Sequence, residues 1–200
     1  MQGDNNMAPH DLVAPQPVES EVIIETRGLS RVYPGVTALD NVNYRVYRNK
    51  VNVLIGENGA GKSTMMKMLA GVETPSSGQI ILDGEAVSLQ STHQAEQLGI
   101  SIIFQELNLF PNMNVMDNIF MANEFFQKGR INEKYQYALA KSLLERLELD
   151  VDPYAPLGEL GIGHQQLVEI ARALSKDTRV LIMDEPTSAL SQSEVKVLFK

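Results

Sequence analysis

The sequence predicts a mixed α/β fold built on a parallel sheet. Short apolar runs alternate along the chain with stretches of helical spacing, and strands that are apolar throughout are typical of a sheet covered by helices on both faces. One of these runs passes directly into a glycine-rich loop that a helical segment follows. The 200 residues, 44% of them hydrophobic, are enough for one domain with its own core but not for two.

The elements are expected in a definite order. Residues 1–20 are rich in proline and polar side chains, which predicts a disordered lead-in to a domain over residues 21–200. Helical spacing from about residue 108 to 175 predicts an inserted helical subdomain. The expected elements are strands at 22–24, 51–55, 79–82 and 100–104, helices at 63–69, 138–147 and 165–174, and a last strand at 180–183.

Composition excludes several classes of function. The formal charge of −8, from 17 Lys and Arg against 25 Asp and Glu, argues against a partner made of nucleic acid. The absence of cysteine excludes disulfides and thiolate zinc sites. Neither a signal peptide nor an apolar run of membrane-spanning length is present. We therefore expect any work at a membrane to proceed through a partner.

The strongest signal is a glycine-rich loop that fits the phosphate-binding pattern G-x-x-x-x-G-K-[ST]. Its glycines let the backbone turn N–H groups toward phosphates, and the following helix directs its positive end at them. Lys62 is expected to reach the outer phosphates as a point charge, and the Ser63 hydroxyl to bind Mg²⁺. The pattern predicts an ATP site made by Gly56, Glu57, Asn58, Gly59, Ala60, Gly61, Lys62, Ser63 and Thr64.

Two acidic residues follow the last expected strand. The apolar run 180–183 delivers Asp184 and Glu185 to its carboxyl end, the edge at which α/β sheets bind ligands. Asp184 is expected to hold the magnesium shell, and Glu185 to orient and polarise the attacking water as the catalytic residue. An acidic pair alone is more often a solvated turn or a helix cap. Combined with the phosphate loop, it predicts a P-loop NTPase.

Further features resemble the ATP-binding cassette (ABC) family. Gln105, directly after an apolar strand, matches the family's Q-loop glutamine, which the resemblance implies contacts magnesium and signals to the helical subdomain. The Ser-Ala-Leu at 188–190 matches the D-loop, implied to contact the opposite subunit. Tyr33 stands where the family places an aromatic ring that stacks on adenine. The family signature is matched, just ahead of a helix, by Leu160, Gly161, Ile162, Gly163 and His164.

The resemblance narrows to one group of the family. The stretches 33–39, 105–111 and 168–174 resemble the ATPases of bacterial importers for ribose, xylose, arabinose and galactose. This implies a RecA-like P-loop core with N-terminal antiparallel strands, and an ATPase coupled to carbohydrate uptake. The implied partners are membrane permease subunits, a periplasmic sugar-binding protein reached through them, and a second ATPase cassette. The implied location is peripheral, on the cytoplasmic face of the inner membrane.

The signature departs from the family's pattern at two positions. Gly161 stands where the family has serine, so it lacks the hydroxyl that contacts the γ-phosphate across a dimer. His164 replaces a glutamine and is expected to be a polar surface residue rather than a catalytic one. ATPases of this group resemble two cassettes fused in one chain, so this signature would face the weaker site. The family's histidine after the D-loop is absent from the 200 residues, so this stretch alone is expected to hydrolyse ATP poorly.

Two alternatives stay open. The first is an ABC ATPase of DNA repair or translation, although the long coiled coils, zinc cysteines and basic linkers usual in those proteins are missing. The second is a nucleotide-binding protein without turnover of its own. A GTPase is disfavoured because the sequence has no Asn-Lys-x-Asp guanine motif.

Overall fold

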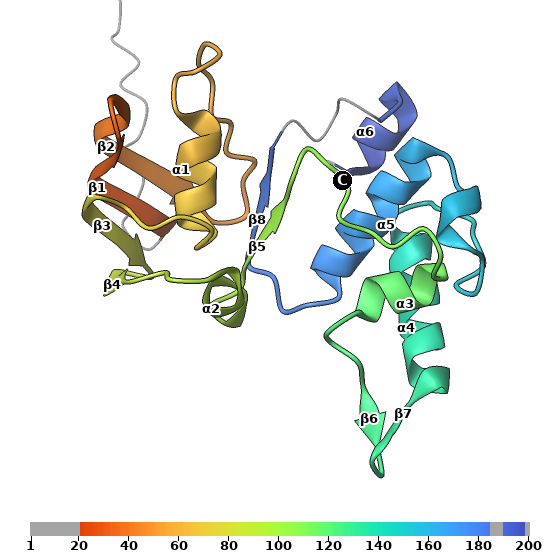
Figure 1. Cartoon of the computed structure of the whole chain (residues 1–200). Coiled ribbons are helices and arrows are strands. Elements are labelled where there is room, and N and C mark those ends of the chain that lie inside the picture. The colour runs from red at the N-terminus through yellow and green to blue at the C-terminus, as the bar shows by residue number, and fades with distance from the viewer. Residues whose placement is uncertain (1–20, 185–189, 199–200) are drawn as a thin grey trace, which may run out of the picture.

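The computed structural model describes residues 21–184 and 190–198, and Figure 1 shows them as two groups of elements joined at a central pair of strands. The expected lead-in at 1–20, the proposed catalytic Glu185 and the first two D-loop residues lie outside the described residues. The elements are β1 Val22–Tyr33, β2 Val36–Tyr47, α1 Lys62–Leu69, β3 Ser77–Leu82, β4 Glu85–Val87, α2 Thr92–Gln97, β5 Ile100–Ile103, α3 Val115–Phe120, β6 Phe126–Gln127, β7 Arg130–Ile131, α4 Glu133–Arg146, the 3₁₀ helix η2 Leu157–Glu159, α5 Ile162–Leu174, β8 Val180–Met183 and α6 Gln192–Leu198.

The N-terminal strands form an antiparallel sheet in the order β2-β1-β3-β4. The expected strand at 22–24 is only the start of β1, which continues for 12 residues before Pro34 and Gly35 turn the chain into β2. Gly35 has a φ of +82°, a conformation that glycine adopts without steric cost. In β1, Ile24 pairs with Leu82 of β3, so the strand joins the hairpin to the rest of the sheet.

The parallel sheet consists, among the described strands, of β5 and β8. Their register places Ile103 opposite Met183 at the carboxyl ends. Val180 and Ile182 face a core shared with α1 and the N-terminal strands, which we call the β core. Leu181 and Met183 face the core formed by α3, α4 and α5, which we call the helical core. Both faces of this sheet are therefore covered, and the expected α/β fold with N-terminal antiparallel strands is confirmed.

The helical core lies on the other side of the parallel pair, as Figure 1 shows. The helices predicted at 138–147 and 165–174 form as α4 and α5, and α3 packs against both. Phe120 of α3 is 1% exposed and meets Phe125 edge to face at 5.7 Å between ring centroids. The two-residue turn at Lys128 and Gly129 closes the short β6–β7 hairpin with positive φ at both positions.

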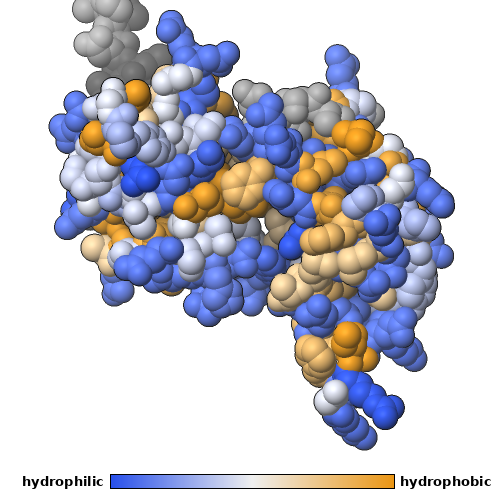
Figure 2. All heavy atoms as spheres, viewed as in Figure 1, coloured by the Kyte–Doolittle hydropathy of each residue, from blue (hydrophilic) through white to orange (hydrophobic). Residues whose placement is uncertain are grey.

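The prediction of a strand at 51–55 is wrong. The segment pairs with no other described strand, and Val51, Val53 and Ile55 are 66%, 66% and 88% exposed. The alternate side chains face the protein, because the Asn52 amide bonds both backbone groups of Tyr47 and Leu54 packs on the β core. The alternation seen in the sequence is real, but a strand also needs a hydrogen-bonded neighbour. Figure 2 shows hydrophobic surface in the region between the two halves, where this segment runs.

Replacing Phe120 by alanine tests the helical core. The loss of a fully buried aromatic ring is expected to lower the free energy of unfolding by about 3–5 kcal/mol. Phe126 offers a matched control, because it is 66% exposed on β6 and its replacement by alanine is expected to cost less than about 0.5 kcal/mol. Urea unfolding of the two variants checks the ranking, and equal losses would contradict this description of the core.

Candidate nucleotide site

The phosphate loop runs from Gly56 to α1 and is exposed as far as Ala60. Its backbone turns at Gly59 and Gly61, whose φ angles are +82° and +83°. The Lys62 ammonium folds back over the loop and donates hydrogen bonds to the carbonyl oxygens of Gly56, at 2.8 Å, and of Glu57, at 2.9 Å. The lysine charge is thus held against the loop, and its role in binding phosphate stays a prediction.

Gly61 is the residue at which the loop becomes a helix. It is the N-cap of α1 and has no side chain to offer the first N–H groups. A Cβ at this position would collide with the Ala38 carbonyl oxygen, so only glycine fits against β2. The first turn of α1 also carries no acidic side chain. The amino end of α1 therefore keeps its unpaired N–H groups and positive potential for an anion.

Other helices in the chain are capped in the usual way. The side chains of Ser91, Asn114 and Asn132 accept a hydrogen bond from the first turns of α2, α3 and α4. By contrast α5, which begins at the signature, has Gly161 as its N-cap and no side-chain cap. The two helices that the sequence patterns associate with phosphates are thus the two that start at an uncapped glycine.

The parallel strands bring the next site residues together. The Asp184 N–H donates to the carbonyl oxygen of Ile103 at 3.2 Å, which holds Asp184 beside the end of β5. Gln105 lies two residues after Ile103, the last residue of β5, and its side chain is exposed. Figure 1 shows the loop before α1 at the same edge as the carboxyl ends of β5 and β8. Gln105 and Asp184 therefore lie near one another, and Ser63 is in the first turn of α1.

These oxygen donors fit magnesium. A hydroxyl, an amide oxygen and a carboxylate, from Ser63, Gln105 and Asp184, are ligands that a hard cation accepts, with water and phosphate completing the shell. The described residues contain no cluster of three or more His, Cys, Asp or Glu side chains that could hold a metal ion.

Tyr33 is the last residue of β1, in the half of the molecule that contains the phosphate loop. Its hydroxyl donates to the Glu73 carboxylate, and the Arg31 guanidinium lies over its ring at 4.8 Å from the centroid. One face of the ring is therefore occupied by Arg31, and a stacked base has to use the other face. The adenine-stacking role stays a prediction.

The signature lies at the amino end of α5, where Leu160 accepts a hydrogen bond from the Gln165 side chain at 2.8 Å. A Cβ on Gly163 would lie 2.7 Å from a carboxylate oxygen of Glu194 on α6, so a larger residue would have to push that carboxylate aside. His164 is half-exposed, with its Nε2 at 4.0 Å from the same carboxylate. Hydrogen bonds from the Ser191 side chain and backbone hold the pKa of Glu194 below its usual value.

One polar cluster was missed at the sequence level. Asn108, after the Q-loop position, donates its backbone N–H to the Glu169 carboxylate, and its carbonyl accepts from Arg172. Glu169 is buried, and burial raises the pKa of its carboxyl group. Asn108 and Glu169 lie in the stretches 105–111 and 168–174, which resemble the sugar-importer group. Nothing in the sequence indicated that these two stretches are in contact.

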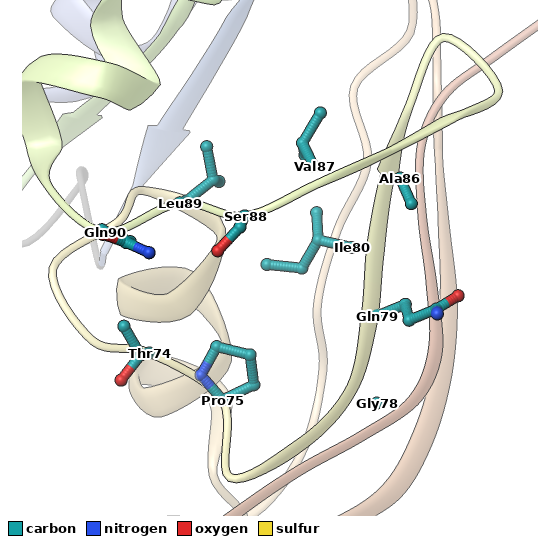
Figure 3. Close-up of a pocket in the computed structure, with 10 residues that line it drawn as sticks. All are labelled: Thr74, Pro75, Gly78, Gln79, Ile80, Ala86, Val87, Ser88, Leu89 and Gln90. Carbon is teal, nitrogen blue, oxygen red and sulfur yellow. The ribbon is translucent and has the colours of Figure 1, made fainter.

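A separate groove of about 580 Å³ lies between β3, β4 and the segment after α1 (Figure 3). Its walls are apolar or neutral and include no charged side chain. Figure 3 shows Ile80, Val87 and Leu89 around it. It is therefore unsuited to nucleotide phosphates, and the candidate site is the open edge around Lys62 rather than this groove. The lining residues are Thr74, Pro75, Gly78, Gln79, Ile80, Ala86, Val87, Ser88, Leu89 and Gln90.

Comparison with known proteins decides the family. Residues 39–188 match the ABC transporter family, a span that includes the phosphate loop, Gln105, the signature and Asp184. The chain belongs to this family. The resemblance to ABC ATPases that the motifs indicated is confirmed.

Curated ABC relatives are proteins of sugar transport. The chain is 49% identical over 177 residues to the L-arabinose transport ATP-binding protein AraG of Geobacillus stearothermophilus, which covers 88% of the chain and 34% of that protein. It is 49% identical to the xylose import ATP-binding protein XylG of Thermoanaerobacter pseudethanolicus, covering 90% and 36%. The chain thus spans about a third of the length of these relatives.

Solved structures show the same ABC fold. The ATP-binding cassette MJ1267 superposes with a TM-score of 0.77 at 26% identity, covering 89% of this chain and 74% of that one. The protein cbiO1 of Clostridium perfringens, part of the cbiONQ transporter complex, gives 0.74 at 29% identity, covering 89% and 72%. Within the described residues, no helix of this chain has the length and apolar character to cross a membrane.

The close approach of Gly61 to β2 predicts a difference between two glycines of the loop. Gly61→Ala is expected to lower both the unfolding temperature and nucleotide affinity, because the new methyl group collides with the Ala38 carbonyl oxygen. Gly59→Ala is the matched control: its φ is the same within a degree, but no atom lies within 4 Å of the added Cβ. Differential scanning calorimetry and titration with ATP measure both effects. Equal losses in the two variants would show that backbone strain alone, and not the contact with β2, governs the loop.

Proposed function

We propose that this chain is the ATP-binding part of a sugar-importing ABC ATPase. The observation that carries the proposal is the uncapped amino end of α1, with Lys62 held over it by two loop carbonyl oxygens. Such an end offers N–H groups, the positive potential of the helix and the Lys62 cation to a polyphosphate. When phosphate oxygens enter, the ammonium exchanges its bonds to Gly56 and Glu57 for charged partners, which are stronger.

The role of the remaining site residues follows from their place at the sheet edge. Ser63, Gln105 and Asp184 would hold magnesium, which supplies positive charge against the β- and γ-phosphates when bound. Glu185 comes next after Asp184 in the sequence, and we assign it to orient the attacking water. Tyr33 would support adenine on the ring face opposite Arg31.

The other half of a working site is proposed to come from a second cassette. The uncapped amino end of α5 supports this, because it presents N–H groups and no acid in its first turn, although Gly161 has no hydroxyl to add. An anion approaching it meets Glu194 of α6 and His164 nearby. The lowered pKa of Glu194 keeps its carboxylate negative, so this residue should weaken the affinity of the signature for phosphate.

The sugar-import role rests on the relatives. AraG and XylG are named for L-arabinose transport and xylose import, and each is nearly half identical to this chain. This similarity favours import over DNA repair or translation. A permease, a periplasmic sugar-binding protein and a location on the cytoplasmic membrane face follow as parts of the proposal. In this proposal the sugar is chosen by those partners.

The phosphate-binding role of Lys62 is tested by Lys62→Ala. The variant is expected to lose nearly all affinity for ATP while keeping its circular dichroism spectrum, because the side chain bonds only to exposed loop carbonyl groups. Lys67→Ala, in the last turn of the same helix, is the matched control and should bind normally. Titration with a fluorescent ATP analogue measures both. Near-normal affinity of the Lys62 variant would remove the basis of the proposed function.

The catalytic role of Glu185 is tested by Glu185→Gln in the full-length protein. The amide keeps the shape of the side chain but cannot act as a base, so ATP binding should survive and turnover should fall by about 100-fold or more. Glu145→Gln, an exposed position on α4, serves as the control and should hydrolyse ATP at the parent rate. Phosphate release decides between a true ATPase and a nucleotide-binding protein without turnover: a parent with no measurable release would support the second.

A further inference from the structure

Two stretches that resemble the sugar-importer group meet in the structure at a single residue. The backbone N–H of Asn108 donates to Oε1 of Glu169 at 3.4 Å, and the Asn108 carbonyl oxygen accepts from Nη1 of Arg172 at 2.9 Å. Glu169 and Arg172 are three positions apart on α5, so both side chains leave the same face of the signature helix. Two side chains of α5 thus hold both backbone groups of one residue.

The way Glu169 is buried argues against a role in packing alone. The residue is 7% exposed, and its second oxygen, Oε2, is buried without a hydrogen-bond partner. A buried carboxylate with an unsatisfied oxygen is costly, and an apolar side chain would fill the same space at lower cost. Burial also raises the pKa of this carboxyl group, while the nearby Arg172 charge opposes the rise. The contact with Asn108 is the feature that an apolar residue could not supply.

Asn108 lies on the segment that connects the parallel sheet to the helical core. The segment leaves β5 after Ile103, passes Gln105, and is hydrogen-bonded to α5 at Asn108. A further attachment follows at Phe110, whose N–H and carbonyl both bond the buried side chain of Asn118 on α3. Only four residues, 104–107, therefore separate the parallel sheet from the helical core along this path.

We propose that Glu169 and Arg172 are positioning residues that fasten the segment after Gln105 to the signature helix, so that Gln105 and α5 move together. The proposal rests on the proposed function, because the movement is expected when Gln105 engages a magnesium-bound nucleotide. The rest of α5 can transmit such a movement, since its inner face is firmly packed in the helical core through Leu167, Val168, Ile170 and Ala171. A displacement at Asn108 is thus carried to the amino end of α5, where the signature lies.

A distance measurement between the two halves of the molecule tests the coupling. The chain has no cysteine, so spin labels can be placed by Ser88→Cys, near β4, and Ser142→Cys, on α4, both exposed positions. The inter-label distance is recorded without nucleotide, with ATP and EDTA, and with ATP and Mg²⁺. ATP affinity is measured in parallel on the same samples by titration.

The parent is expected to show a shift of the distance that requires magnesium. Glu169→Ala and Arg172→Ala should each lose that shift while keeping affinity for ATP in EDTA, because the phosphate loop is untouched. Glu169→Gln should retain the shift, since its amide oxygen can still accept from the Asn108 N–H. A merely structural role would not separate the glutamine variant from the alanine variant in this readout. If Glu169→Ala fails to fold, Arg172→Ala alone carries the comparison.

The outcomes that overturn the proposal are distinct from failure of the proposed function. A parent that binds Mg-ATP without any shift, or alanine variants that keep the shift, would show that Asn108 is not the coupling point. A glutamine variant that behaves like alanine would show that the hydrogen bond is not what matters. A parent that binds no nucleotide would overturn the proposed function, and this inference with it.

Discussion

The site depends on one close contact between backbone and backbone. Gly61 lies against the Ala38 carbonyl oxygen, and this contact, which excludes any side chain, fixes the point at which the loop ends and α1 begins. Because a glycine caps the helix, its first N–H groups have no side-chain acceptor. An ordinary N-cap such as Asn114 on α3 would stabilise the isolated helix by about 1 kcal/mol and would occupy one of the donors that an anion needs. The amino end of α1 is therefore less stable than a capped end would be, but its N–H groups remain available to an anion.

The parallel pair of β5 and β8 supplies the second constraint. Parallel strands end at the same edge, so the residues after them, Gln105 and Asp184, arrive together although they are far apart in sequence. The α1 helix packs on one face of this pair and α5 on the other. The two uncapped helices are therefore placed by the same two strands. The candidate site residues are concentrated at one edge because the two parallel strands end there together.

The parts of the site that the sequence predicted are those encoded locally. The phosphate loop, Gln105 and Asp184 each stand next to a strand or helix whose pattern is visible in a short window. The strand at 51–55 failed because alternation reveals which side chains face inward but not whether a neighbour exists to pair with. The contact of Glu169 with Asn108 spans 61 positions, and a glutamate on an amphipathic helix is ordinarily read as surface. A local pattern predicts neither the pairing of a strand with its neighbour nor the burial of a side chain by a distant segment.

The strands β5 and β8 also belong to both cores at once. Ile100 and Ile182 are buried in the β core, while Ile103 is buried in the helical core, so eight strand residues form a wall common to two hydrophobic clusters. Neither cluster can lose its packing without exposing one face of that wall. The two halves should consequently melt as one cooperative unit, with a single transition seen by probes in either half.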